Sequence, residues 1–585
     1  MMPEVLHTPI TPEETVLLRI VAQDPSVKAG GKILTARVAV PAEHLEPGPW
    51  GHRVQVLDYD GSSRTYLAPL AYKVDRQGLP MDPFVSAADR ALLTNPQFHQ
   101  QNVYAIVTRT LATFERVLGR RISWGFRAHQ LKVLPHAFQD ANAFYSDRDA
   151  GLFFGYFAGD RGDVFTCLSH DVVAHETAHA LLDGLRTRFT DPSSSDQAAF
   201  HEGFADIVAL LSVFQLPEIV SELLAVVGHG HNKRVPRRLL GDKRFVSQVL
   251  FGMAKEMGGA LHLPGRVLRS SYAIAPSRGA YKSPEFGEPH RRGELLVVAM
   301  LHAFVRVWQA RLEPLGVGGH GPLDRERVVE EGANAAQHLL GIAIRGLDYT
   351  PPVHLTFGDF LSAILTADQE IQPDDSRFQY RRKLLASFAE WGIDPSAKAP
   401  SRARAERAPR TPGLWCPVDG RDLSYHGVHQ EAMRRDPDEV FRFLWENRVA
   451  LHLRDEAYSQ VISVRPCRRV APDGAPLQET VVEFSQTWEL TGREQRRLGL
   501  EATSEEDEDD GTTAKLVGGA TLLFDDFGRL KYFIHNSVGN LRRQSARLEY
   551  QRAVLRSGLA PARRFDELHR RRAMDDRLLG PADRW

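Results

Sequence analysis

The sequence predicts a mixed α+β fold, and three stretches with different hydrophobic patterns carry that prediction. Residues 12–75 contain short alternating or β-branched runs separated by proline and glycine, which is typical of strands and turns. From about Pro96 the apolar residues recur at helical intervals, and alternation returns at 479–490 and 518–534. We therefore expect a β-rich beginning, a mixed and then helical middle, and an α+β end.

The same patterns predict domain boundaries. A β-rich N-terminal domain is expected over 1–90, either as an inhibitory pro-region or as a structural cap. The main domain follows at 91–397, with helices expected at about 290–312, 324–345, 356–368 and 378–391. Residues 398–413, rich in Pro, Ala and Arg, predict a flexible linker. Beyond it we expect an α+β domain of unknown role at 414–560 and a tail with mixed charge at 561–585. Within that domain an acidic run at 505–510 predicts a solvated loop, with calcium binding as the alternative.

Composition limits the class of protein. The chain has 585 residues, 43% hydrophobic and 25% charged, which is ordinary for globular proteins and predicts two to four domains. A net charge of −1 gives no general attraction to nucleic acid or to an anionic membrane. The first residues lack a basic region followed by an apolar one, and the longest strongly apolar run, near 295–301, is too short to span a bilayer. A cytoplasmic location is the expectation, with non-classical export left open.

Three cysteines, Cys167, Cys416 and Cys467, are scattered over the chain. An odd, dispersed set suits a reducing compartment and argues against a disulfide framework. None has the spacing of a metal ligand. Cys167 is interpreted as a buried structural thiol, with a redox or inhibitory role as the alternative.

The motif with the most chemical content is His175-Glu176-Thr177-Ala178-His179. The surrounding apolar pattern predicts a helix over 172–185, and residues i and i+4 share one face of a helix, so both histidines can reach one cation. A catalytic Zn²⁺ typically has three protein ligands and a water whose pKa falls to about 7. Glu176, beside that water, is the candidate general base.

A second predicted helix, over 199–214, supplies the candidate third ligand. Glu202 and Asp206 are again i and i+4, in a segment that is otherwise mostly apolar. Buried carboxylates persist when they are paired or bind a metal, so we interpret Glu202 as the third zinc ligand and Asp206 as the acceptor of a histidine N–H. An amphipathic helix with both carboxylates in solvent is the alternative, and Asp183 is the alternative third ligand.

With these residues in place, the chain resembles the gluzincin metallopeptidases, in particular their thermolysin-like and fungalysin-like branches. Glu202 follows His179 by 23 residues, close to the spacing in that group. The resemblance covers roughly residues 90–395. It implies a thermolysin-like two-lobe catalytic domain, with a mixed α/β lobe before the motif and a helical lobe after it.

The resemblance also implies roles for residues outside the two helices. The run from Asn142 and Ala143 to Tyr145 is similar to the edge strand on which thermolysin-like enzymes bind the substrate backbone; an ordinary strand is the alternative. His290, at the beginning of the helix expected at 290–312, resembles the fungalysin histidine that stabilises the oxyanion. A surface histidine near a helix start is the alternative there.

The sequence departs from the family at one point. Thermolysin-like enzymes have a tyrosine between the second histidine and the third ligand, and residues 180–201 contain none. Tyr272 or Tyr281 could replace it, and His201 stands where relatives often have Asn. Two functions follow as hypotheses. The first is a zinc endopeptidase that acts on a peptide or protein substrate, and the second is a gluzincin-fold zinc-binding scaffold or interaction protein with little or no turnover.

Overall fold

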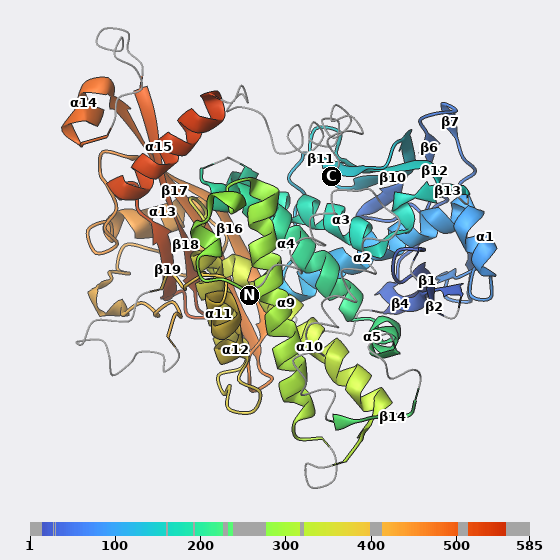
Figure 1. Cartoon of the computed structure of the whole chain (residues 1–585). Helices are drawn as coiled ribbons and strands as arrows, with labels where there is room; N and C mark the ends of the chain where they lie inside the picture. The colour runs from blue at the N-terminus through green and yellow to red at the C-terminus, as the bar shows by residue number, and fades with distance from the viewer. Residues whose placement is uncertain are drawn as a thin grey trace, which may run out of the picture.

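The computed structural model of the chain is a mixed α+β protein with twelve α-helices and several sheets among the residues it describes (Figure 1). The described residues are 14–26, 28–29, 31–159, 162–190, 193–225, 232–237, 276–315, 321–397, 412–500 and 513–556. At this level the α+β prediction is confirmed. Residues 398–411 of the linker expected at 398–413, the acidic run at 505–510 and the tail at 561–585 lie outside the described residues.

A five-stranded mixed sheet underlies the first half of the molecule. Its strand order is β11-β12-β10-β5, and β13 also pairs with β12. β10 runs parallel to β12 and β5, whereas β11 and β13 are antiparallel to β12. The strands are β5 (Val54–Val56), β10 (Leu131–Gln139), β11 (Ala143–Ser146), β12 (Gly151–Gly159) and β13 (Gly162–Phe165).

The first 90 residues share a sheet and a hydrophobic core with residues beyond the boundary expected at residue 90. β5 is paired with β10, and apolar residues from 18–84 lie in one hydrophobic core with residues from 91–397. Val21 N–H also donates to the Asn102 side chain at 2.8 Å. The N-terminal strands pair as β1 (Thr15–Val21) with β4 (Thr35–Pro41), β2 (Lys28–Ala29) with β3 (Lys32–Ile33), β6 (Tyr59–Asp60) with β7 (Thr65–Tyr66), and β8 (Lys73–Val74) with β9 (Pro80–Met81).

Helices cover one face of the sheet and continue into a helical layer (Figure 1). The long helix α2 (Pro96–Leu118) packs against β4, β5 and β10, with α1 (Asp89–Thr94) before it. α3 (His170–Leu185) lies between α2 and α4 (Ser195–Phe214), and α5 (Pro217–Leu224) follows. The four later helices match the expected ranges closely: α9 (Pro289–Leu312), α10 (Arg325–Gly346), α11 (Phe357–Ile371) and α12 (Tyr380–Ala389).

Helix α9 is a core helix. Among the described residues, Arg291–Leu312 is the one straight helix long and apolar enough to cross a membrane, and 78% of its most apolar window is buried inside the protein. The bent pair Ser195–Phe214 and Pro217–Leu224 passes the same test only when both helices are taken together, at an angle of 83°. Burial against α4, α10 and α12 accounts for the apolar composition of α9.

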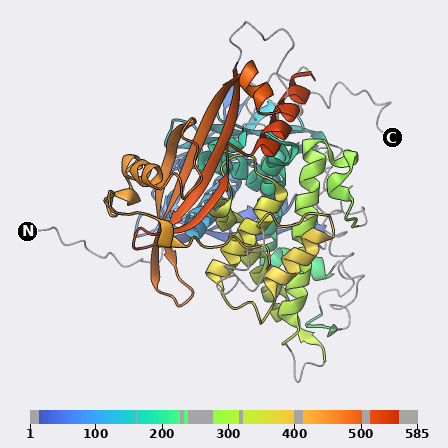
Figure 2. The ribbon, with the colours of Figure 1, turned by 90° about the vertical axis from the view of Figure 1, so that its left-hand side faces the viewer.

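The C-terminal region forms a four-stranded antiparallel sheet in the order β16-β17-β18-β19, which lies beside the helical layer (Figure 2). Its elements are α13 (Pro437–Glu446), β16 (Tyr458–Val470), β17 (Pro476–Thr491), α14 (Gly492–Arg497), β18 (Thr513–Phe524), β19 (Leu530–Asn536) and α15 (Leu541–Arg556). The alternation at 479–490 and 518–534 therefore corresponds to strands, and residues 525–529 form the turn between β18 and β19.

A buried ionic network fastens this sheet to the rest of the chain. Arg120 donates to both carboxylate oxygens of Asp348, at 2.6 and 2.7 Å, and Arg469 from β16 binds Asp348 as well. Arg469 also donates to Glu479 at 2.6 Å. Burial opposes the charge on Asp348, but the two guanidinium groups outweigh it and hold the pKa of Asp348 well below its usual range. The α+β region after residue 414 is thus joined to the helical layer through charged groups that are all buried.

Candidate metal centre

The candidate centre is built by two helices that pack side by side. α3 is buried around most of its circumference, and α4 begins at the N-cap Ser194, whose hydroxyl accepts the Gln197 N–H at 3.1 Å. Apolar side chains hold the two helices together, so the polar residues of the motif face each other across the contact. In this way helix periodicity brings His175 and His179 opposite Glu202.

The three predicted zinc ligands lie together. Their donor atoms, one from each of His175, His179 and Glu202, all lie within 4.8 Å of one another. The two histidine Nε2 atoms are 2.9 Å apart, and the nearer Glu202 oxygen is 3.6 Å from His175 Nε2 and 3.8 Å from His179 Nε2. Two imidazole nitrogens and a carboxylate oxygen at this separation are a donor set that fits Zn²⁺.

Further side chains orient the two histidines. His175 Nδ1 lies 2.9 Å from Asp206 Oδ1, a distance at which the carboxylate can accept the histidine N–H. His179 Nδ1 lies 3.0 Å from Nδ1 of His201. Sequence reasoning noted His201 but gave it no partner, because its contact with His179 depends on how α3 and α4 pack.

The carboxylates make this place favourable for positive charge. Burial works against a charged His175, but hydrogen bonds to Asp206 and Glu202 and the nearby charge of Glu176 outweigh it and raise the pKa of His175 well above its usual value. His175 remains the most accessible of the three ligands, with 17% of its side chain exposed, whereas His179 is fully buried. A cation is therefore favoured at a position that solvent can approach from the His175 side.

Glu176 and Asp183 have distinct surroundings on α3. Glu176 is 4% exposed and lies close enough to His175 to act on its charge, which suits a base beside the metal. Asp183 Oδ2 accepts the Tyr145 hydroxyl at 2.8 Å, and Asp183 is not one of the grouped ligands among the described residues. The geometry thus favours Glu202 over Asp183 as the third ligand.

A glycine contact places the beginning of α9 beside the centre. A side chain at Gly203, next to Glu202, would meet Gly293 O at 3.0 Å, and one at Gly293 would meet Ala199 O at 3.1 Å. The two helices therefore approach closely because both positions lack a Cβ. His290 lies in the first turn of α9, and its side chain lies outside the described residues.

Neither of the tyrosines considered as substitutes for the missing one is available as a free hydroxyl in the described part of the chain. The Tyr281 hydroxyl donates to Asp196 of α4, which also binds Arg292 and accepts the Phe357 N–H at 2.9 Å. The Arg292 guanidinium lies 4.4 Å from the Tyr281 ring centre. Tyr281 therefore joins the segment before α9 to α4, and Tyr272 lies outside the described residues.

β11 is the terminal strand of its sheet in the described structure, and it contacts α3. The Asn142 carbonyl accepts the Gly155 N–H at 2.8 Å, so Ala143 and Tyr145 direct their backbone groups away from β12. The Ala143 N–H, however, donates to the side chain of Asn142 at 2.8 Å. The Ala143 N–H is therefore already used, and the Ala143 carbonyl is the backbone group of this residue that remains for the expected contact with a substrate.

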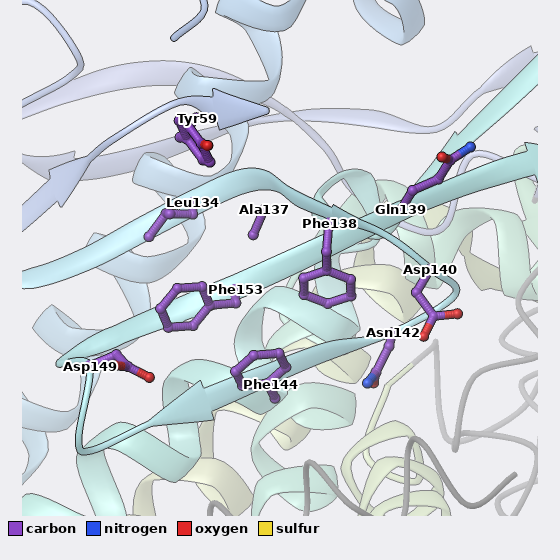
Figure 3. Close-up of a pocket in the computed structure, with 10 residues that line it drawn as sticks. All are labelled: Tyr59, Leu134, Ala137, Phe138, Gln139, Asp140, Asn142, Phe144, Asp149 and Phe153. Atoms are coloured by element: carbon purple, nitrogen blue, oxygen red, sulfur yellow. The ribbon is translucent and has the colours of Figure 1, made fainter. Parts of the chain in front are cut away.

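A hollow of about 470 Å³ lies on the other face of the same sheet (Figure 3). Phe138, Phe144 and Phe153 line it in a row. The ring centre of Phe144 lies 5.5 Å from that of Phe138 and 5.1 Å from that of Phe153. Tyr145 points to α3, and neighbouring residues of a strand face opposite sides. The hollow is therefore separated by the sheet from the His175–His179–Glu202 group, although Asn142 borders it.

No protein-family model matches this chain, and no curated protein matches it. The likeness to gluzincins therefore rests on the residues and geometry described above.

Proposed function

We propose that the chain is a zinc-dependent endopeptidase with a thermolysin-like arrangement of its site. The observation that carries the proposal is the convergence of His175, His179 and Glu202, whose donor atoms lie within 4.8 Å of one another. The contact of Asp206 with His175 supports the same assignment, because metal-binding histidines usually donate their second N–H to a carboxylate or carbonyl.

Bound zinc would supply the positive charge that polarises the scissile carbonyl and acidifies a neighbouring water. Glu176 takes the proton of the attacking water and delivers it to the leaving amine. β11 aligns the substrate as an additional strand through the Ala143 carbonyl, with Asn142 at the end of that strand. His290, in the first turn of α9, is the proposed donor to the oxyanion.

Replacing Glu176 with Gln tests this mechanism. The variant keeps the shape of the side chain and loses the base, so zinc content should stay at the wild-type level while peptide hydrolysis falls by about 10²–10⁴-fold, the usual contribution of a general base. Cleavage of a peptide library and zinc content are measured on the full chain, because residues 1–90 share its core. Glu218→Gln, at an exposed position of α5, is the matched control. Unchanged hydrolysis by Glu176→Gln would contradict the mechanism.

A zinc-binding scaffold with little or no turnover is the second candidate. The observation that favours it is the hydroxyl of Tyr281, which is bonded to Asp196, together with the lack of a tyrosine in residues 180–201. The same experiment separates the two: zinc bound by His175 and His179, with no cleavage of any peptide by the wild type, supports the scaffold.

A further inference from the structure

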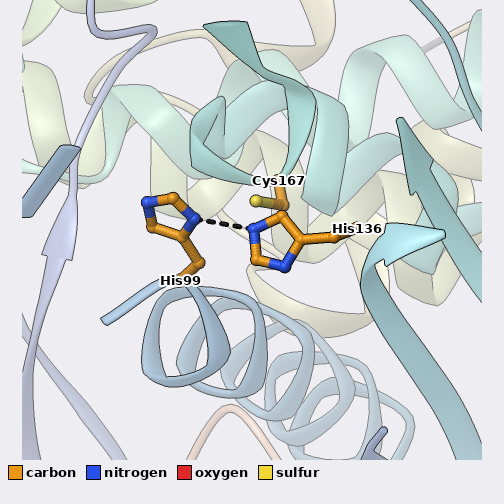
Figure 4. A group of neighbouring side chains, drawn as sticks. All are labelled: His99, His136 and Cys167. Carbon is orange, nitrogen blue, oxygen red and sulfur yellow. Dashed lines mark hydrogen bonds between the residues drawn. The ribbon is translucent and has the colours of Figure 1, made fainter. Parts of the chain in front are cut away.

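We propose that His99, His136 and Cys167 form a second metal site, which binds a d¹⁰ cation, Zn²⁺ in the first place, and has a structural role. The inference is independent of the endopeptidase proposal, because it concerns other residues and another part of the fold. Figure 4 shows the three side chains converging on one point.

The three residues come from three different elements. His99 lies on α2, His136 on β10, and Cys167 on the short 3₁₀ helix η1 (Thr166–Leu168) that precedes α3. One donor atom of each lies within 4.8 Å of the other two. Exposure is 1% for His99, 3% for His136 and 0% for Cys167. The group is therefore closed to solvent.

The hydrogen bonds of the two rings determine where their protons lie. His99 Nε2 is 3.1 Å from the Leu93 carbonyl, and His136 Nδ1 is 2.7 Å from Asp58 Oδ1. A carbonyl oxygen and a carboxylate accept hydrogen bonds, so both of these ring nitrogens carry the hydrogen. Gln100 Nε2 donates to the other Asp58 oxygen at 2.7 Å, which holds the carboxylate in place.

The remaining nitrogens, His99 Nδ1 and His136 Nε2, then face each other with their lone pairs at 2.8 Å. Two neutral rings in these tautomers form no hydrogen bond with each other, because neither nitrogen has a proton to donate. The contact therefore requires a positive charge between the two nitrogens, either a proton on a His136 imidazolium paired with Asp58 or a metal ion that both nitrogens bind. The sulfur of Cys167, which a shared proton does not need, favours the metal. The thiol of Cys167 is the third donor at the same point.

The donors indicate the class of metal. Imidazole and thiolate ligands suit Zn²⁺ and Cu⁺, whereas Mg²⁺ and Ca²⁺ prefer oxygen. Cys167 binds the ion as a thiolate, so its thiol proton is released to water while the chain opens locally to admit the ion. Asp58 and the Leu93 carbonyl take the place that outer partners of metal-bound histidines usually occupy. The Phe165 ring packs against both imidazoles and helps to exclude water from the site. Its ring centre lies 4.6 Å from that of His99 and 5.2 Å from that of His136.

The location of the site explains a structural role. Cys167 precedes His170, the first residue of α3, by three residues. An ion held by His99, His136 and Cys167 would join α2 and β10 to the beginning of the helix that carries His175 and His179. Loss of the ion should therefore lower thermal stability even in a chain whose first centre is empty.

The test uses the full chain with His175→Ala and His179→Ala, so that any bound metal belongs to the second site. After incubation with zinc and gel filtration, elemental analysis should find one zinc per chain in this double variant and two in the wild type. Adding Cys167→Ala should remove the remaining zinc, whereas Cys416→Ala, at a partly exposed cysteine outside the cluster, should keep it. Incubation with Cu⁺ in place of zinc, without oxygen, identifies the preferred ion.

X-ray absorption of the double variant decides the case even if the Cys167→Ala chain fails to fold. The proposal expects one sulfur at about 2.3 Å and nitrogens at about 2.0 Å from the metal. No metal in the double variant, or a metal without a sulfur ligand, would overturn it. An inactive wild type with a sulfur-bound metal would reject the peptidase and keep the second site. An active wild type whose only zinc disappears in the double variant would keep the peptidase proposal and reject the second site.

Discussion

Two histidine pairs of the described structure, His175–His179 and His99–His136, have nearly the same internal geometry and very different surroundings. The facing nitrogens are 2.9 Å apart in His175 and His179 and 2.8 Å apart in His99 and His136. In each pair one histidine has an aspartate on its outer nitrogen, Asp206 in the first and Asp58 in the second. The difference lies in the third donor and in access from solvent.

The third donor is a carboxylate in the first group and a thiol in the second. Glu176 and Asp206 add further negative charge around the first group, where the His175 side chain is 17% exposed. Around the second group an aromatic ring and buried backbone replace solvent. Catalytic zinc sites keep a position open and structural ones are closed, so the difference in access agrees with the catalytic role proposed for the first group and the structural role proposed for the second.

The largest expected effect is that of a chelator, which should remove the two metals in separate phases. The first should leave rapidly from the side of His175 and take all hydrolytic activity with it. The second should leave only when the chain opens around Cys167, because that group is buried, with at most 3% of any of its residues exposed. Activity and bound metal are followed together against time of exposure to the chelator. Loss of both metals in one phase would contradict the difference in solvent access between the two groups.

Replacing the two aspartates separately should give matched, local effects. Asp206→Asn should weaken zinc binding at the first group by about 10–100-fold, the usual effect of losing an outer partner of a metal-bound histidine, and Asp58→Asn should do the same at the second. Competition with a chromophoric chelator measures both affinities. Each variant serves as the control for the other, and an effect of Asp58→Asn on the first group alone would contradict the assignment.

The smallest expected effect concerns the contact between α4 and α9. Gly203→Ala puts a Cβ 3.0 Å from Gly293 O, so α9 must shift, and overpacking of this kind costs about 1–3 kcal/mol of stability. Peptide hydrolysis should fall while zinc binding at the second group persists, because His99, His136 and Cys167 lie on elements other than α4 and α9. Gly341→Ala is a matched control within α10, where an added Cβ meets nothing within 4 Å. Equal hydrolysis by both variants would show that the position of α9 does not matter for the first group.

Much of the fold could be predicted because local patterns carry it. The helices expected at 290–312 and 324–345 agree with α9 and α10 within one residue at each end, since their apolar residues repeat with the period of a helix. The boundary at residue 90 could not be predicted in the same way. It depended on the pairing of β5 with β10, which joins residues 54 and 131 and has no local signal.

Local helix periodicity was enough to pair the two histidines of the first group. His179 follows His175 by four positions, and helix geometry converts that interval into a shared face, so these two candidate ligands could be named before any packing was known. Tertiary structure alone decided the contact of His179 with His201, the bond that occupies Tyr281, and the whole second group. His99 and His136 are 37 residues apart, and α2, β10 and η1 meet only because the sheet packs on the helices. Cys167 had no metal-ligand spacing in the sequence for this physical reason: its neighbours in space come from long-range packing, which a short interval along the chain does not encode.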